Sequence, residues 1–383
     1  MMNKEIKALY IHIPFCDHIC KYCDFVKRVS NKQDDYMVAL IKELTLRKEY
    51  LGHLESIYIG GGTPSCLKLS LLSSFLGELF KIIGNYSIKE ITIEANPKDI
   101  TTDFIKIVKH YNINRISLGI QSFNNQKLLD MGRNHDKLIA INALKLLKDF
   151  PNVNVDFIFG FPMSKGEDSF HIVKHDIDIA LKYNVKHISC YSLILENKTI
   201  LKYDYDHNKV KLLSDDKEAN IYYKVQHYLE KKGLKCYEVS NFAYPGYESI
   251  HNLTYWDNNH YIGVGAAASY YIDNVRYTNT FDIAQYINEI NNNGISNILY
   301  QEVNKLSLNN QMEEELMLGF RKAKGINIEI FRKKFEISIF DAFPRIKRAI
   351  TEDYLKIVDN YLYISLNRLY IMNSIILYCI GDK

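Results

Sequence analysis

The chain has 383 residues, of which 47% are hydrophobic and 24% charged, and its formal net charge is +3. This composition is ordinary for a globular protein long enough for one large and one smaller domain, and so small a charge does not favour nucleic acid as a partner. No apolar run approaches the ~18 residues of a membrane-spanning helix, and the N-terminus lacks the apolar core of a signal peptide. We therefore expect a cytoplasmic location, where reducing conditions keep the seven cysteines out of disulfides.

The first predicted element is a strand that ends in a loop rich in cysteine. Apolar residues alternate from Leu9 to Ile13, as they do in a half-buried strand. Pro14 ends the strand because proline has no N–H to donate to a sheet. The loop at the C-terminal end of this strand holds three cysteines in a C-x₃-C-x₂-C pattern: Cys16, Cys20 and Cys23.

Three clustered cysteines limit the kinds of site that this loop can form. The other four are scattered between residues 66 and 379, which does not suit a disulfide framework. A closed zinc site needs a fourth ligand, and His12 or His18 would have to supply it. Three thiolates on one short loop suit a [4Fe–4S] cluster in which one iron stays open to a small molecule. The spacing favours the cluster, with zinc as the alternative.

Beyond this loop the sequence alternates between strand and helix. Strands are predicted at Ile57–Ile59, Glu90–Glu94, Arg115–Gly119, Val153–Phe159 and His187–Leu193. Helices are predicted at Asp34–Leu51, Leu69–Ile83, Thr101–Tyr111, Asn124–Leu129, Asp136–Lys148 and Ser169–Tyr183. Repeated β–α units imply parallel strands joined by right-handed crossovers. Eight units would close a TIM barrel, so six predict an α/β fold with an open, partial (β/α)6 barrel.

The cysteine spacing resembles the signature of the radical SAM enzymes. The wider string YIHIPFC…C-x-YCDF, which runs from Tyr10 to Phe25, is similar to that of a narrower group, the HemN/HemW family of coproporphyrinogen dehydrogenases and heme chaperones. The resemblance implies the partial-barrel fold, a [4Fe–4S] cluster, S-adenosylmethionine (SAM) as its exchangeable ligand, and a reductant of the flavodoxin or ferredoxin type.

Polar residues stand where the predicted strands end, which is the edge that carries the chemistry in β/α barrels. The Gly60–Thr63 loop is a candidate for holding the amino and carboxylate ends of SAM, because glycine lets backbone approach a ligand closely. Glu94 ends an apolar strand and could accept hydrogen bonds from a ribose. A buried charge such as Asp156 is costly unless it is paired. Gln121 and Arg133 follow the fourth strand; ordinary loop polarity is the alternative for both.

The resemblance assigns roles to single residues through its motifs. The tyrosine before HIPFC, the tyrosine of C-x-Y-C, the GGGT loop and the glutamate before x-N-P imply SAM contacts at Tyr10, Tyr22, Gly61, Gly62, Thr63 and Glu94. The glutamine of G-x-Q-S-F, the arginine of G-R-x-H and the aspartate of the fifth strand imply a second ligand region at Gln121, Arg133 and Asp156. One SAM molecule is expected, and a second stays open. Tyr22 could stack on the adenine, whereas Tyr10 has a packed core aromatic as its alternative reading.

An extension follows the six units. A polar stretch, Glu196–Asp215, breaks the β–α rhythm and precedes a predicted helix at Lys217–Lys232. The string H-N-x-x-Y-W then begins at His251. A histidine can ligate heme iron, and the residues alone equally suit a buried, hydrogen-bonded histidine that ties this segment to the barrel mouth. The string resembles the motif associated with heme binding in the HemW chaperones, which implies His251 as a heme contact.

The C-terminal part is predicted to form a small, helix-rich domain that resembles the winged-helix-like cap of the same family. Apolar residues at i, i+4 and i+8 (Met312, Leu316, Phe320) indicate a helix from Ser307. Further helices are predicted at Ile328–Phe335, Phe340–Ile350 and Asn373–Cys379, and a hairpin at Tyr354–Leu366. The expected domains are a barrel at 1–235, an extension at 236–300 and a C-terminal domain at 301–383.

Two departures from the dehydrogenase branch favour the chaperone branch. Asp24-Phe25 follows Cys23 where that branch has another cysteine nearby, and Cys16 comes soon after the N-terminus where that branch has a long preceding segment. We therefore expect a protein that binds the cluster, SAM and heme, and delivers heme to an acceptor protein that could be membrane-associated. The alternatives are an oxygen-independent coproporphyrinogen III dehydrogenase and a radical SAM enzyme that modifies heme.

Overall fold

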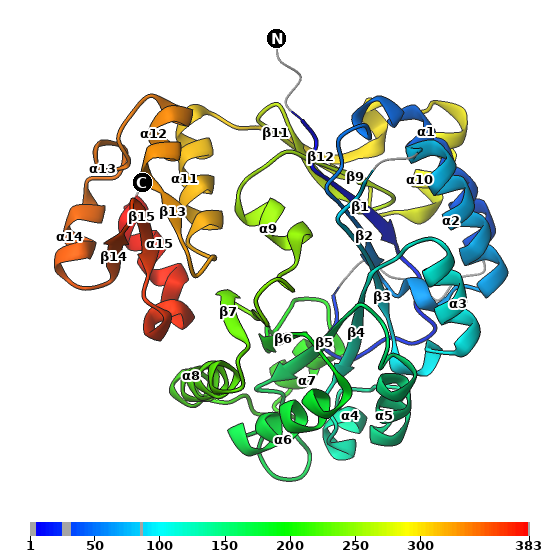
Figure 1. Ribbon diagram of the computed structural model, residues 1–383, viewed down its shortest axis with the longest axis horizontal. Helices are drawn as coiled ribbons and strands as arrows, with labels where there is room; N and C mark the ends of the chain where they lie inside the picture. Colours follow the sequence, from blue (N-terminus) through cyan, green and yellow to red (C-terminus); the bar gives the residue numbers. More distant parts are fainter. Residues whose placement is uncertain (1–4, 25–31, 85–86, 382–383) are drawn as a thin grey trace.

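A mixed sheet of twelve strands forms the centre of the computed structural model, which describes residues 5–24, 32–84 and 87–381 (Figure 1). The strand order is β12-β11-β10-β9-β1-β2-β3-β4-β5-β6-β8-β7. Phe25, the last residue of the cysteine-rich string, lies outside the described residues.

The middle of the sheet consists of the six predicted strands, all parallel to their neighbours. They are β1 (Ala8–Ile13), β2 (Ser56–Gly61), β3 (Glu90–Ala95), β4 (Arg115–Gln121), β5 (Asn152–Phe159) and β6 (His187–Ser192). Their buried apolar residues pack beneath the crossover helices, as expected for a parallel sheet covered on its outer face. The predicted partial α/β barrel is confirmed.

Shorter strands that the sequence analysis did not anticipate extend the sheet on both sides. β9 pairs parallel with β1, and antiparallel strands continue from it, while β8 and β7 add antiparallel strands beyond β6. Their bounds are β7 (Lys235–Glu238), β8 (Asn241–Ala243), β9 (Tyr261–Val264), β10 (Ser269–Ile272), β11 (Val275–Asn279) and β12 (Tyr300–Lys305). β7 crosses the expected domain boundary at 235/236, and the division into three domains stays a prediction.

Helices cover one side of the sheet, and α9 lies on the other side, between the sheet and the C-terminal part (Figure 1). The helices of the larger part are α1 (Gln33–Leu46), α2 (Leu69–Ile83), α3 (Thr102–His110), α4 (Asn125–Asp130), α5 (Lys137–Leu146), α6 (Phe170–Ala180), α7 (Ile200–Asp206), α8 (Asp215–Lys231), α9 (Ile250–Trp256) and α10 (Ile283–Asn292). Thr101 caps α3 as expected, because its hydroxyl accepts from Phe104 N at 3.1 Å.

The C-terminal part combines a three-stranded antiparallel sheet, ordered β13-β15-β14, with five helices. Its elements are α11 (Leu308–Gly319), β13 (Ile326–Asn327), α12 (Ile328–Phe335), α13 (Ile339–Ala342), α14 (Arg345–Thr351), β14 (Leu355–Val358), β15 (Tyr361–Ile364) and α15 (Met372–Ile380). The predicted hairpin is β14–β15. The single helix predicted at Phe340–Ile350 was wrong, because Pro344 cannot continue a helix and separates α13 from α14.

Short 3₁₀ segments complete the secondary structure. They are η1 (Lys48–Tyr50), η2 (Pro64–Cys66), η3 (Pro97–Asp99), η4 (Leu181–Tyr183), η5 (Asn297–Leu299) and η6 (Leu366–Ile371). The predicted Asp34–Leu51 helix ends at Leu46 and continues only as η1. Within the described ranges, no helix has both the length and the apolar character needed to cross a membrane.

Candidate cofactor site

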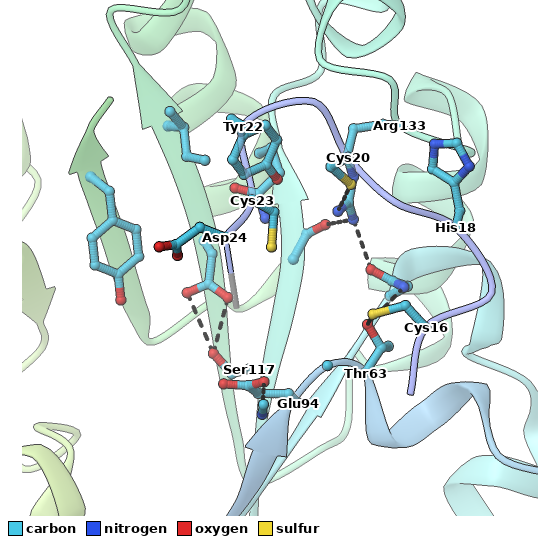
Figure 2. A pocket seen from close by; sticks show the side chains of 18 of the residues that line it. Cys16, His18, Cys20, Tyr22, Cys23, Asp24, Thr63, Glu94, Ser117 and Arg133 are labelled. Carbon is cyan, nitrogen blue, oxygen red and sulfur yellow. Dashed lines mark hydrogen bonds between the residues drawn. The ribbon is translucent and has the colours of Figure 1, made fainter. Parts of the chain in front are cut away.

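A cavity of about 410 Å³ opens at the C-terminal edge of the parallel strands (Figure 2). Its position follows from the fold, because loops that leave neighbouring parallel strands meet at one edge of the sheet. Most of the predicted site residues line it: Cys16, Cys20, Cys23, Tyr22, Gly61, Gly62, Thr63, Glu94, Gln121, Arg133 and Asp156. Two predicted residues, Tyr10 and His251, do not.

The cysteine loop is held in place by contacts with distant segments. Lys21 N donates to Met131 O at 3.1 Å, and Leu201 N donates to Lys21 O at 2.9 Å. His18 Nε2 and Gly132 O are 2.5 Å apart. These contacts join the loop to the ends of α4 and α7 and fix where the thiols face the cavity.

The three thiols, all half-buried, open onto the same cavity (Figure 2). Cys16 Sγ lies 3.5 Å from Thr63 Oγ1, and Arg133 Nη1 donates to Cys20 Sγ at 3.4 Å. In the described part of the chain, no three His, Cys, Asp or Glu side chains are grouped as the ligands of one metal ion are. A [4Fe–4S] cluster does not require this, because each thiolate binds a separate iron. Three thiols on one loop, with a cationic donor against one of them, fit such a cluster.

The glycine triplet is shaped by close packing. A Cβ on Gly60 would lie 2.7 Å from both Glu94 Cδ and Tyr58 Cε1. Gly61 has φ +110°, a conformation that other residues rarely adopt, and a Cβ there would meet the His12 ring at 2.6 Å. A Cβ on Gly62 would lie 2.5 Å from Phe15 O, in the cysteine loop. The triplet therefore lets Glu94 and the cysteine loop approach β2 closely.

Glu94 is held by donors on both carboxylate oxygens. Tyr58 OH donates to Oε1 at 2.7 Å, and Gly61 N donates to Oε2 at 3.0 Å. Burial raises the pKa of Glu94 to about 7; Asp156 adds to this, while Tyr58, Gly61 N and Arg115 oppose it. A fixed carboxylate at the cavity wall suits hydroxyl donors such as those of a ribose.

Comparison with known proteins identifies the family. The radical SAM superfamily model matches residues 10–173, and the HemN C-terminal domain model matches residues 306–367. The heme chaperone HemW of Lactococcus lactis is 39% identical over 88% of this chain and 87% of the relative, and that of Bacillus subtilis is 36% identical over 91% and 92%. The chain belongs to the HemW family of radical SAM proteins.

A solved structure supports the fold of this HemW-family chain. The coproporphyrinogen III oxidase HemN from Escherichia coli superposes with a TM-score of 0.82 over 98% of this chain and 90% of its own, at 19% sequence identity. Membership in the radical SAM superfamily implies a [4Fe–4S] cluster and SAM, which agrees with the three thiols and the carboxylate on one cavity.

The second predicted ligand region of this HemW-family chain forms the wall beside the cysteines. Arg133 Nη2 donates to Asn96 Oδ1 at 2.8 Å and to Gly119 O at 2.7 Å, while its buried Nε has no hydrogen-bond partner within the described part of the chain. Gln121 ends β4 with φ +66°, a strained value for a residue other than glycine. Asp156 accepts from Asn154 Nδ2 at 2.7 Å, and burial raises its pKa. The structure brings all three onto one cavity.

His251 does not line the cavity and packs instead against Tyr58, which does. Its side chain is buried, with the residue 1% exposed; Nδ1 is 2.9 Å from Ser56 Oγ, and Nε2 is 2.7 Å from Tyr255 OH. Burial, assisted by Arg115, lowers the pKa of His251 to about 3, so the ring is neutral. Both nitrogens are hydrogen-bonded, as the alternative interpretation of a tying histidine requires, but Ser56 is the first residue of β2, so His251 contacts the N-terminal end of this strand and not the barrel mouth. The role of His251 as a heme contact stays a prediction that would require the ring to change partners.

Tyr10 also lies behind the cavity wall. Its hydroxyl is 2.9 Å from His12 Nδ1, and its ring centroid is 6.2 Å from that of Tyr58. In this arrangement Tyr10 packs among aromatic rings, as its alternative reading suggested, and its contact with SAM stays a prediction.

Sequence reasoning missed several residues that line the cavity. They are Tyr58, Asn96, Ser117, Tyr191, Ile194 and Glu196. For Ser117 the available signal was strand phase: it is two residues before Gly119 and four before Gln121, both of which line the cavity, so it projects from the same face of β4.

One wall of the cavity is tied to the C-terminal part. Glu218 of α8 accepts at Oε1 from Ser192 of the cavity wall and from Tyr370 of η6, the latter at 2.9 Å. The Tyr370 ring also packs against Tyr222, with centroids 5.3 Å apart. A single carboxylate of the larger part thus bridges the cavity wall and the C-terminal part.

Proposed function

We propose that the protein binds a [4Fe–4S] cluster, SAM and heme, and passes heme to an acceptor protein. The observation that supports this most is the convergence of three thiols, the glycine triplet and Glu94 on one cavity, in a chain whose relatives named heme chaperones are up to 39% identical over most of its length. We propose a location in the cytoplasm, an acceptor that is membrane-associated, and a reductant of the flavodoxin or ferredoxin type.

Each part of the cavity has a role in this proposal. Cys16, Cys20 and Cys23 hold three corners of the cluster, and Arg133 donates a hydrogen bond to one of the thiolates. Gly61, Gly62, Thr63, Glu94 and Tyr22 orient SAM, with Tyr10 behind them; Gln121, Arg133 and Asp156 form the wall for a second ligand. When bound at these three cysteines and reduced, the cluster would supply the electron needed for cleavage of SAM.

The proposal that the protein binds heme depends on its membership in the HemW family. The relatives at 39% and 36% identity are named heme chaperones, whereas the structural match to a coproporphyrinogen III oxidase, at 19% identity, concerns the fold. We therefore expect heme binding without turnover of coproporphyrinogen III, and His251 is the contact that the H-N-x-x-Y-W motif suggests.

The test uses the full chain, reconstituted anaerobically with iron and sulfide. We expect one [4Fe–4S] cluster by iron analysis and EPR, a change of the EPR signal on adding SAM, and a Soret band that saturates at one heme per chain. Incubation with SAM, a reductant and coproporphyrinogen III should leave the porphyrinogen unchanged. Formation of protoporphyrinogen would contradict the chaperone proposal and favour the dehydrogenase; modification of heme under the same conditions would favour a heme-modifying enzyme.

A further inference from the structure

His251 and Tyr58 form a stack that ends on the Glu94 carboxylate. The rings of His251 and Tyr58 have centroids 5.1 Å apart at an interplanar angle of 33°. The hydroxyl of the same tyrosine donates to Glu94 Oε1 at 2.7 Å. Tyr58 and Glu94 line the cavity, and His251 lies behind them.

Hydrogen bonds to β2 and β3 hold the base of this stack. α9 presents its N-terminus to Glu90, whose Oε2 accepts from Ile250 N at 2.9 Å and whose Oε1 accepts from Ser249 Oγ at 3.1 Å. The carboxylate thereby satisfies donors that a helix N-terminus leaves open. Ser56 pairs in register with Glu90, and its Oγ lies within hydrogen-bond distance of His251 Nδ1, at 2.9 Å. The histidine is therefore anchored to β2 by its side chain and to β3 through its helix.

The tyrosine has little freedom to leave the stack. Gly60 provides the space for both partners, because a Cβ there would lie 2.7 Å from the Tyr58 ring and 2.7 Å from Glu94 Cδ. Burial raises the pKa of the Tyr58 hydroxyl well above its usual value, so the group stays protonated and remains a donor. Its ring is bounded by His251 on one side and by Tyr10, at 6.2 Å, on another.

We infer that Tyr58 and His251 are positioning residues for Glu94: the histidine of H-N-x-x-Y-W supports the tyrosine ring, and the tyrosine hydroxyl orients the carboxylate toward SAM. This inference rests on the proposed SAM site and assigns the motif histidine a task that needs no contact with heme. It explains why the buried histidine, which contacts both Ser56 and Tyr255, also packs against Tyr58 of the cavity lining.

The test measures SAM affinity by equilibrium dialysis on the anaerobically reconstituted chain, for variants matched in iron content. Tyr58→Phe removes only the donor to Glu94, and a lost hydrogen bond predicts about a fivefold rise in the SAM dissociation constant. His251→Ala should produce a rise of similar size. In the double variant the two effects should not add, because the histidine acts through the tyrosine.

The pH dependence of SAM affinity distinguishes a positioning role of Tyr58 from a general structural defect in the variant. The charged and titratable groups that influence or face Glu94 are Tyr58, Asp156, Arg115, Tyr10 and Tyr191. The Tyr58 hydrogen bond lowers the pKa of Glu94, so in Tyr58→Phe the pH at which half of the SAM affinity is lost should move upward. A merely structural role would weaken binding equally at every pH.

His260→Ala is the matched control, since His260 is a buried histidine of the same extension that packs on Tyr271 at 5.3 Å and does not line the cavity. It should leave SAM affinity unchanged. Normal SAM affinity in Tyr58→Phe would overturn the inference, as would fully additive effects in the double variant. Loss of the heme spectrum in His251→Ala with normal SAM affinity would instead make this residue a heme ligand. If the wild type binds no SAM, the proposed function itself fails.

Discussion

Gly62→Ala should displace the cysteine loop from β2. The added Cβ would lie 2.5 Å from Phe15 O, 2.8 Å from Phe15 N and 2.9 Å from Ile13 O. These are backbone atoms that cannot rotate away. An ordinary contact needs about 3.4 Å, so the loop must retreat by roughly 1 Å. The same backbone carries the bonds Gly62 N to Ile13 O, at 2.9 Å, and Thr63 N to Phe15 O, at 2.7 Å.

The expected cost combines two effects. Overpacking a tight site costs about 1–3 kcal/mol, and weakening two backbone hydrogen bonds adds about 1 kcal/mol, giving roughly 2–4 kcal/mol in the free energy of unfolding. Because the loop holds the thiols, Gly62→Ala should also lower iron content per chain after reconstitution and weaken SAM binding at least about tenfold. Urea melts, iron analysis and dialysis measure the three quantities.

Gly77→Ala is the control for this experiment. Gly77 lies in α2, and a Cβ there would meet only the end of the Tyr111 side chain, with the hydroxyl at 3.2 Å. Alanine favours helix over glycine by about 1 kcal/mol, so this variant should be as stable as the wild type or more stable. Normal iron content and normal SAM affinity in Gly62→Ala would refute the proposed contact between the glycine triplet and the cysteine loop.

Three further predictions concern two residues that line the cavity and one buried ion pair outside it. Burial raises the pKa of Glu94 to about 7, so the folded chain binds more protons than the unfolded chain between pH ~4.5 and 7, and the contribution of Glu94 to stability falls as pH rises through that window. Glu94→Gln should therefore gain stability relative to the wild type from pH 5 to 7.5 in thermal melts. Parallel curves of stability against pH for the two proteins would contradict this prediction. Lys127→Met should lower the free energy of unfolding by about 3–5 kcal/mol, since it leaves Asp168 unpaired where both side chains are fully buried. Lys217→Ala breaks an exposed ion pair and should change the free energy of unfolding by less than about 1 kcal/mol. Equal effects of the two variants would show that burial does not determine the contribution of the Lys127–Asp168 pair. Arg133→Gln should lower the midpoint potential of the reconstituted cluster in an EPR redox titration, because a hydrogen bond to a cluster sulfur favours the reduced state; an unchanged potential would count against that bond.

The parallel half of the fold was predictable because each strand is a compact apolar run bounded by a helix. The strands of the extension were not, because they have three to six residues and are rich in tyrosine and polar residues. Their pairing also depends on distant partners, as in β9 with β1. Local periodicity carries no information about such pairing.

In the candidate site, too, some residues could be predicted from local sequence and others depended on tertiary packing. Residues in conspicuous motifs, such as Glu94 and the cysteines, were identified because polar side chains at strand ends are unusual. Tyr58 was missed because an aromatic residue inside a strand looks like core. The depth of His251 could not be predicted either, since its position depends on where α9 lies against the sheet. Local motifs in the sequence indicate which residues have the chemistry of a site, whereas tertiary packing decides which of their side chains line the cavity.

The shared oxygen of Glu218 has a consequence for communication across the molecule. Ser192 on the cavity wall and Tyr370 in the C-terminal part donate to the same atom, so a movement of either donor alters the bond that the other makes. If a cavity ligand shifts Ser192 and thereby changes the contact between Glu218 and Tyr370, a change imposed at Tyr370 must alter the affinity for that ligand in return, because linkage is reciprocal.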